Sequence, residues 1–281
     1  GFAPLARALS GPAIDVVILA DRLTADILVL VFGFQPRDLD YMKAWYSRFG
    51  SGVVLEFLEF EGPRVAAQIH FVDEMHKELN GFLDTLIDSP SEAIQQFVFQ
   101  VDSAFENRHT TRSLLKSLIF ASGHTLSNQI SNTLEVIASQ KEEHQLTMST
   151  NAAYSPRLVA DECTRIRPVF RGSHRVATKD ILIGDIEVGP GDYLVTWNTS
   201  ANLDETTFPN PEVIQVRDRQ MRHLSFGRGI HRCVGAALGS SVITTVVAQV
   251  LRSQTRLSIE TAVPGKDPWM DSFEALRINV Q

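Results

Sequence analysis

The chain has 281 residues, of which 44% are hydrophobic and 21% charged, a composition that is ordinary for a globular protein and gives no sign of disorder or of a fibre. Its formal net charge of −7 argues against general affinity for nucleic acid or for an anionic membrane surface, because both require an excess of lysine and arginine. Two cysteines are too few for a disulfide framework or a four-cysteine zinc site, and we expect a cytoplasmic protein.

The first half of the chain has a helical pattern, in which apolar residues recur every three or four positions from Ala13 to Gln140. Its most apolar stretch, 14–32, carries three aspartates and an arginine, so we interpret it as a core helix and not as a membrane span. We also expect no secretory signal at the start of the chain. The last helix of this half is predicted to be the longest, from about Thr111 to Lys141. Turn signals at 33–36, 50–52, 62–63 and 89–90 divide the region into about five helices.

A further helix is predicted to begin at Ser155 and Pro156, because serine can cap a helix and proline suits its first position. Pro168 predicts its end. Two β-rich runs follow, at 180–188 and 193–197, and the Gly-Pro-Gly sequence between them indicates that they form a hairpin.

The last third contains a loop rich in Asn, Asp and Pro at 200–211 and an apolar run at 235–251 that predicts a buried helix. The tail beyond this helix alternates only weakly in polarity and gives little indication of its structure. Because no internal repeat or linker is present, we predict one domain over residues 1–281, mainly α with a small β element.

One segment, His223-Leu-Ser-Phe-Gly-Arg-Gly-Ile-His-Arg-Cys233-Val-Gly235, combines a cysteine with three glycines and leads directly into the predicted helix. The glycines permit tight turns and let a flat, bulky group approach the backbone. A cysteine at a helix N-terminus faces unpaired N–H groups and the positive end of the helix dipole, which favour a thiolate, a good iron ligand. The alternative is a glycine turn before a core helix. Cys163, within a helical run, is interpreted as a small buried hydrophobe.

The spacing Phe-Gly-x-Gly-x-His-x-Cys-x-Gly resembles the heme-binding loop of the cytochromes P450, and every specified position is present. The resemblance implies a heme b cofactor with Cys233 as the metal ligand. Arg175, His223 and His231 stand where the family places donors to the heme propionates. The other residues that the resemblance assigns to cofactor binding are Phe226, Gly227, Gly235 and Ala121.

Glu162 and Arg165 stand three residues apart on one helical face, where they can hold each other and brace a neighbouring loop. Most pairs of this kind are ordinary surface ion pairs. Here the β-rich runs, the Ala201-Asn202 loop and the cysteine loop follow in the family's order, so the pair resembles the family's structural Glu-x-x-Arg.

The long helix contains Ala121-Ser122-Gly123-His124-Thr125, which resembles the segment that crosses the distal heme face in the family. There a glycine-loosened turn, an acid and a threonine guide protons to oxygen. Thr125 matches the threonine, whereas Ser122 takes the glycine's place and His124 the acid's. Histidine can relay protons near neutral pH but is not an equivalent carboxylate. The alternative is that these polar side chains are only solvated or bonded to helix neighbours.

The resemblance runs from near Asp15 to the C-terminus, and the family's N-terminal sheet has no counterpart before Gly1. We therefore expect a P450-like fold that lacks its N-terminal portion. A shortened fold would expose one side of the heme, which predicts a homo-oligomer or a partner that covers it. Five arginines could receive an acidic redox partner such as a ferredoxin, or could only brace the loop and the propionates. They are Arg217, Arg219, Arg222, Arg228 and Arg232, against the single acid Asp218.

These resemblances imply a heme-thiolate oxidoreductase, a P450-type monooxygenase acting on a small organic molecule. Because Ser122 and His124 differ from the family's glycine and acid, an alternative is an enzyme that uses peroxide or rearranges its substrate without a reductase. A hypothesis from another class is a catalytically silent P450-like scaffold that activates a partner enzyme. The identity of the substrate does not follow from the sequence.

Overall fold

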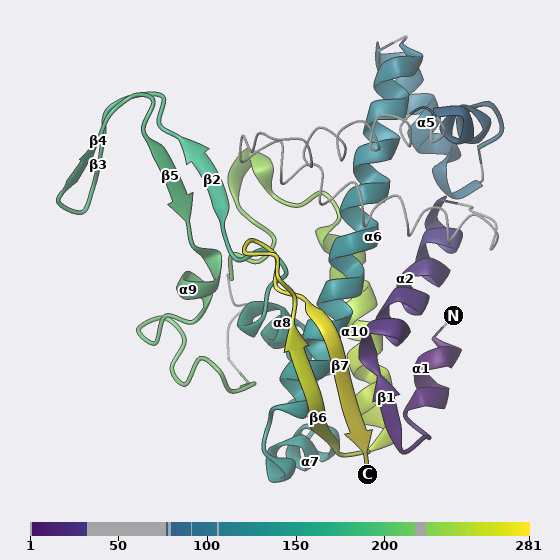
Figure 1. Ribbon diagram of the computed structural model, residues 1–281, viewed down its shortest axis with the longest axis vertical. Helices are drawn as coiled ribbons and strands as arrows, with labels where there is room; N and C mark the ends of the chain where they lie inside the picture. The colour runs from purple at the N-terminus through teal and green to yellow at the C-terminus, as the bar shows by residue number, and fades with distance from the viewer. Residues whose placement is uncertain (1, 33–76, 78–79, 91, 106, 217–222) are drawn as a thin grey trace. The chain divides into compact units, whose positions relative to one another are not determined.

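The computed structural model describes residues 2–32, 77, 80–90, 92–105, 107–216 and 223–281 (Figure 1). These residues are mainly helical and form three small sheets, which confirms the predicted fold class. The chain divides into two compact units: a first unit of residues 21–127, and a second unit of residues 2–20 and 128–281. The turn signals at 33–36, 50–52 and 62–63 lie outside the described residues.

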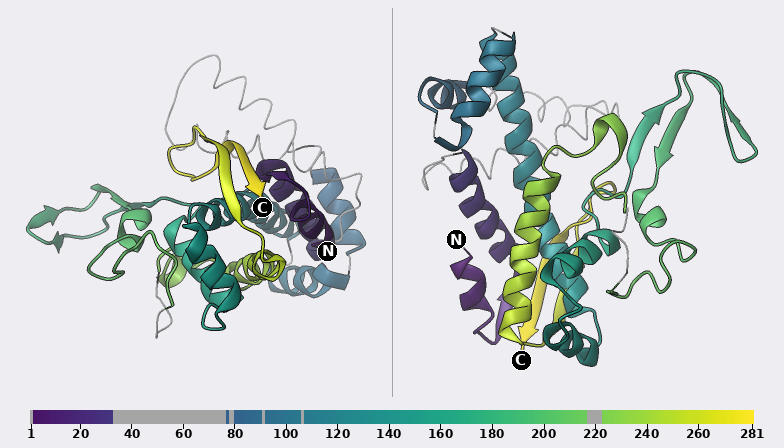
Figure 2. Two further views of the ribbon diagram at one scale, coloured as in Figure 1. Left: turned by 90° about the horizontal axis from the view of Figure 1, so that it is seen from below. Right: turned by 180° about the vertical axis from the view of Figure 1, so that it is seen from behind.

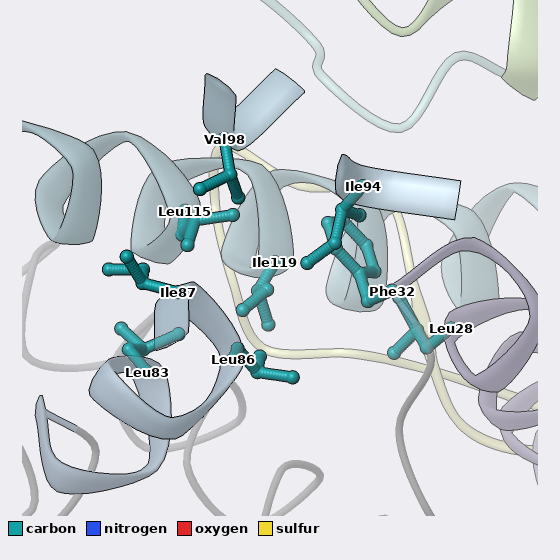
Figure 3. Packing of buried hydrophobic residues seen from close by; sticks show 9 residues of the cluster. All are labelled: Leu28, Phe32, Leu83, Leu86, Ile87, Ile94, Val98, Leu115 and Ile119. Carbon is teal, nitrogen blue, oxygen red and sulfur yellow. The ribbon is translucent and has the colours of Figure 1, made fainter. Parts of the chain in front are cut away.

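The first unit is built from helices that bury one shared apolar cluster. It includes α5 (Glu92–Phe105), most of α2 (Val16–Phe32) and the first two thirds of α6 (Arg108–Ala138). A helix at residues 80–88 ends at the predicted Ser89-Pro90 turn. Figure 3 shows the cluster, whose members are Leu28, Phe32, Leu83, Leu86, Ile87, Ile94, Val98, Leu115 and Ile119. The predicted core helix and the predicted long helix are both confirmed, the latter displaced by three residues at each end.

The second unit combines helices with a three-stranded antiparallel sheet of order β1-β7-β6. Helix α10 packs against α8, and both can be followed in the right-hand view of Figure 2. The elements of this unit outside the smaller sheets are α1 (Ala3–Ala8), β1 (Ala13–Asp15), α7 (Glu142–Thr150), α8 (Pro156–Ile166), α9 (Asn198–Asn202), α10 (Ala236–Ser253), β6 (Leu257–Pro264) and β7 (Phe273–Val280).

Helix α8 begins and ends where its sequence predicts. The hydroxyl of Ser155 accepts a hydrogen bond from the Leu158 N–H (3.3 Å), and Pro156 occupies the first turn. The helix ends before Pro168, which cannot continue its hydrogen-bonding pattern. Cys163 is fully buried, as predicted. Burial also raises the pKa of its thiol well above the usual range, so this cysteine is an inert core residue.

The strand pairing predicted after α8 is wrong. The run at 180–188 folds back on itself, so that β3 (Ile181–Ile183) pairs with β4 (Ile186–Val188). The turn between them contains Gly184, whose φ of +60° favours glycine. Strand β5 (Tyr193–Thr196) pairs instead with β2 (Ser173–Val176), and Figure 1 shows the β3–β4 hairpin at the far end of this pair. The Gly-Pro-Gly sequence leads from one to the other.

The C-terminal tail forms two eight-residue strands that weak alternation did not predict. Strand β6 is exposed along almost its whole length, and its pairing with β7 contains two irregularities, so neither strand shows a regular two-residue pattern. Of the described helices, α10 alone is long and apolar enough to cross a membrane by composition. Because six of its residues are buried in the second unit, we interpret it as the apolar helix predicted at 235–251.

Candidate functional site

The cysteine loop, residues 223–235, is closed by two backbone hydrogen bonds. The Gly227 N–H donates to the Leu224 carbonyl (2.9 Å) and so closes a turn. The Cys233 N–H donates to the Phe226 carbonyl (2.8 Å), which places the cysteine beside that turn. Gly227 and Gly229 have φ values of +65° and +70°, which other residues rarely adopt. The loop conformation therefore requires glycines at two of the motif positions.

The Cys233 side chain is exposed, two residues before the N-cap of α10. Apolar side chains accompany it at the surface, since Ile230 is 96% and Val234 86% exposed. A Cβ atom at Gly235 would lie 3.8 Å from the Cys233 Sγ, so a glycine there leaves space beside the sulfur. A thiol with space beside it and apolar neighbours suits a flat, hydrophobic, iron-containing ring. On this chemistry the residues fit heme.

The aromatic residue of the motif fastens the loop to α10. A Cβ built at Gly239 would lie 3.6 Å from the Phe226 ring, which shows that the ring covers the helix backbone at this glycine. The His223 ring also contacts Phe226, with 5.8 Å between centroids. Phe226 is therefore half-buried against α10, whereas Cys233 is exposed. Gly239 was not among the predicted site residues, because it lies beyond the motif.

Glu162 and Arg165 form a fully buried ion pair on α8, which confirms the predicted brace. The guanidinium donates two hydrogen bonds to the carboxylate, of 2.6 and 3.1 Å. Its remaining bonds go to the carbonyls of Asn202 (2.8 Å) and Pro211 (2.7 Å), and the Phe208 ring lies 4.9 Å from its central carbon. A buried charge needs such complete pairing, since removing it from water is costly.

Two residues that the sequence analysis missed connect this ion pair to the cysteine loop. Asn202, fully buried at the end of α9, accepts a hydrogen bond from the Leu224 N–H (2.7 Å) and donates one to the Ser225 hydroxyl (3.0 Å). The same hydroxyl donates to the Thr164 carbonyl (2.8 Å). Asparagine and serine are common in loops, so their spacing alone gives no signal, and only the Ala201-Asn202 pair hinted at this position.

His223 opens the loop with its ring largely shielded from solvent. Burial, reinforced by the positive charge of Arg165, lowers the pKa of His223 to about 4. The ring is therefore neutral near pH 7. Its Nδ1 accepts a hydrogen bond from the Ser225 N–H (3.2 Å), so the proton of the neutral ring lies on Nε2. His223 can thus act as a neutral N–H donor, and not as a cation.

We predict that the protein without heme loses stability as the pH falls from about 6.5 to about 4. Unfolded histidine binds its proton near pH 6.5, whereas folded His223 resists protonation until about pH 4, so the unfolded state is favoured between these values. The full effect is at most on the order of 3 kcal/mol. Urea titrations across this range should give a shallower pH dependence for His223→Gln than for wild type. The same slope in both proteins would contradict the prediction, and the exposed His109→Gln serves as control.

The other predicted propionate donors lie at the surface of the second unit. Arg175 is exposed on β2 and donates to the carbonyl of His174 (2.6 Å). His231 is exposed and ends a short 3₁₀ turn, Gly229–His231. Both side chains are accessible to an anionic group. Their contact with propionates stays a prediction.

The predicted distal residues lie on α6 in the first unit, whereas the cysteine loop lies in the second. The Thr125 hydroxyl donates to the Ala121 carbonyl, one turn earlier. The Ser122 hydroxyl donates to the carbonyls of Leu118 (2.7 Å) and Ile119 (3.2 Å). Both hydroxyls therefore bond to the backbone of their own helix. Ala121 is exposed, and His124 is half-buried.

Of the five arginines expected to form a basic patch, the structure describes two. Arg228 and Arg232 are both exposed on the cysteine loop. Arg217, Arg219 and Arg222, with Asp218, lie outside the described residues. Among the described residues, no group of three or more His, Cys, Asp or Glu side chains could hold a metal ion. Cys233 as a metal ligand stays a prediction.

The family model for cytochrome P450 matches residues 132–273, half of the chain, and this chain belongs to the cytochrome P450 family. The match covers α8, the smaller sheets, the cysteine loop and α10. The predicted family resemblance is thereby confirmed.

Known proteins agree with this assignment. Cytochrome P450 109 of Bacillus spizizenii is 26% identical over 236 residues, which are 82% of this chain and 54% of that protein. The 20-oxo-5-O-mycaminosyltylactone 23-monooxygenase of Streptomyces fradiae is 30% identical over 148 residues, 53% of this chain and 35% of that enzyme. The chain thus spans about half or less of the length of these relatives.

A solved structure supports the fold over nearly the whole chain. The crystal structure of the cytochrome P450 enzyme CYP109B1 from Bacillus subtilis superposes with a TM-score of 0.81 at 20% sequence identity. The match covers 98% of this chain and 75% of that one. The chain therefore has a P450 fold and spans about three quarters of that structure.

Proposed function

We propose that this chain is the heme-binding part of a P450-type monooxygenase that acts on a small organic molecule. The observation that carries the proposal is the exposed Cys233 sulfur, in a glycine loop that hydrogen bonds tie to a fully buried ion pair. Membership of the family supports heme as the cofactor. We propose heme b, which when bound supplies iron redox chemistry that activates oxygen for insertion into an organic substrate.

In this proposal Cys233 holds the iron as a thiolate, and the loop shapes the surface that receives the ring. Phe226 fastens the loop to α10, while Gly227 and Gly235 permit its backbone to turn and leave space beside the sulfur. The propionate donors are Arg175, His223 and His231, of which His223 donates as a neutral Nε2–H. Ala121 is proposed as a further cofactor-binding residue, on the family resemblance of its motif.

Proton supply is assigned to Thr125, His124 and Ser122. A hydroxyl that donates to a helix carbonyl keeps its lone pairs for accepting a proton donor, so Thr125 and Ser122 can accept from water. A histidine can release or take up a proton near neutral pH. The absence of a carboxylate at residue 124 favours a second candidate, an enzyme that uses peroxide or rearranges its substrate and so needs no reductase.

For the partners, we propose an acidic electron donor such as a ferredoxin, which the exposed Arg228 and Arg232 could attract. We also propose a second copy of the chain, or another protein, as a partner that covers one apolar side of the heme. We propose a cytoplasmic location, which the low cysteine count supports. No part of the proposal requires nucleic acid or a membrane.

The test is the absorption spectrum of the purified, heme-loaded protein after reduction in carbon monoxide. We expect a thiolate-type Soret band and one heme per chain. A band typical of a neutral ligand would contradict the thiolate assignment. A protein that takes up no heme would favour the silent scaffold, which has no physical need for an exposed thiol in a constrained loop.

A further inference from the structure

We propose that Asn202 is a positioning residue that sets where Cys233 presents its sulfur. It does so because its hydrogen bonds connect the buried ion pair to the cysteine loop. The inference rests on the proposed function, in which that sulfur holds the iron. It assigns a role to a residue outside the cysteine motif and outside the Glu-x-x-Arg motif.

Asn202 is bonded at both its main chain and its side chain. Its carbonyl accepts from the Arg165 guanidinium (2.8 Å), which ties it to the fully buried pair with Glu162. Its side-chain oxygen accepts from the Leu224 N–H (2.7 Å), and its side-chain nitrogen donates to the Ser225 hydroxyl (3.0 Å). One buried residue thus joins the core of α8 to the first turn of the cysteine loop.

The two side-chain hydrogen bonds of Asn202, to Leu224 and Ser225, form a clamp on the loop. Few further bonds separate this clamp from Cys233. Leu224, held through its N–H, accepts at its carbonyl from the Gly227 N–H (2.9 Å). Phe226, between these two residues, accepts from the Cys233 N–H (2.8 Å). A displacement of residues 224–225 therefore moves both backbone bonds that place Cys233.

The pattern of donors and acceptors admits an amide and excludes a carboxylate. The Leu224 N–H can only donate, so the atom facing it must accept. The Ser225 hydroxyl gives its proton to the Thr164 carbonyl (2.8 Å), so the atom facing its oxygen must donate. The Asn202 amide supplies this acceptor and this donor in one orientation. An aspartate would place an acceptor against the serine oxygen, which would draw the serine proton away from Thr164 and leave that carbonyl unpaired.

The experiment compares Asn202→Asp and Ser225→Ala with Asn151→Asp as a matched control. Asn151 is exposed, and its side-chain oxygen accepts from the Ala153 N–H (3.0 Å), a bond that an aspartate keeps. Ser225→Ala is the milder change, since it leaves the bond from Leu224 to Asn202 in place. It keeps the test informative if the aspartate variant folds poorly.

Two readouts are required. In the heme-loaded, carbon monoxide-bound protein, we expect Asn202→Asp to convert most of the thiolate-type Soret band to the neutral-ligand type, Ser225→Ala to convert a smaller share, and Asn151→Asp to match wild type. In the protein without heme, we expect the Leu224 and Cys233 amide hydrogens to exchange about tenfold faster in Asn202→Asp.

The readouts separate failure of this inference from failure of the proposed function. If wild type shows the thiolate-type band and Asn202→Asp shows it undiminished, the positioning role is wrong while the proposed function stands. If wild type binds no heme, the proposed function fails, and unchanged amide exchange in Asn202→Asp would overturn the clamp as well. A global loss of protection without selective change at the loop would also overturn it, because that result describes general destabilisation.

Discussion

Replacing Cys233 with alanine is expected to abolish the thiolate-type Soret band and leave the stability of the protein without heme almost unchanged. The side chain is exposed, so its removal should change the free energy of unfolding by no more than about 0.5 kcal/mol. Heme content should fall because the single metal ligand is lost. The measurements are the spectrum in carbon monoxide, heme per chain, and urea unfolding.

The chain provides a matched control for this substitution in its other cysteine. Cys163 is fully buried within α8, so Cys163→Ala leaves a small cavity and should cost about 1 kcal/mol of stability. Its spectrum should match wild type. Cys233→Ala is thus expected to change the spectrum and not the stability, and Cys163→Ala the stability and not the spectrum. A Cys233→Ala protein that kept full heme content and an unaltered spectrum would disprove the ligand assignment.

The second large effect is expected from Glu162→Gln, which should destabilise the second unit by about 3–5 kcal/mol. The substitution keeps the shape of the side chain and removes its charge, so the fully buried Arg165 guanidinium loses its counter-ion. The bond that Glu162 accepts from the Gln215 N–H (3.1 Å) should weaken as well. Urea unfolding measures the loss, and heme retention should decrease with it, because the same pair holds Asn202.

A surface pair provides the control for this prediction. Glu260 and Arg277 form a 2.9 Å ion pair in which the side chains are 44% and 57% exposed. Glu260→Gln should therefore cost no more than about 1 kcal/mol, because solvent screens the pair. Equal effects from the two glutamine substitutions would show that burial does not decide the strength of the pair at Glu162, contrary to the prediction.

Helices proved more predictable than strands in this chain. A helix pattern repeats over many residues, and the long run ending near Lys141 and the capped start at Ser155 were located to within about three residues. Strand pairing depends on contacts between distant segments. Nothing local indicated that β5 pairs with β2, or that β1 pairs with β7 near the far end of the chain.

The residues of the candidate site also divide into those that the sequence predicted and those that it did not. The Cys233 loop was identified because glycine, histidine and cysteine at fixed spacing form a rare pattern, and the Glu162 and Arg165 motif because it stands in the family's order. Asn202 and Ser225 were missed because their role arises only when three separated segments meet. The low pKa of His223 could not be foreseen either, since it depends on burial beside Arg165.

Two main-chain hydrogen bonds hold residues 211–215, which follow α9, to the buried ion pair. Arg165 binds the carbonyl of Pro211, and Glu162 binds the N–H of Gln215. Any amino acid presents a carbonyl, and any except proline an N–H. These two anchors therefore prescribe how many residues separate them. Ile214 between them is fully buried, whereas Glu212 and Val213 are exposed, so insertions and deletions are more disruptive here than substitutions at the two exposed positions.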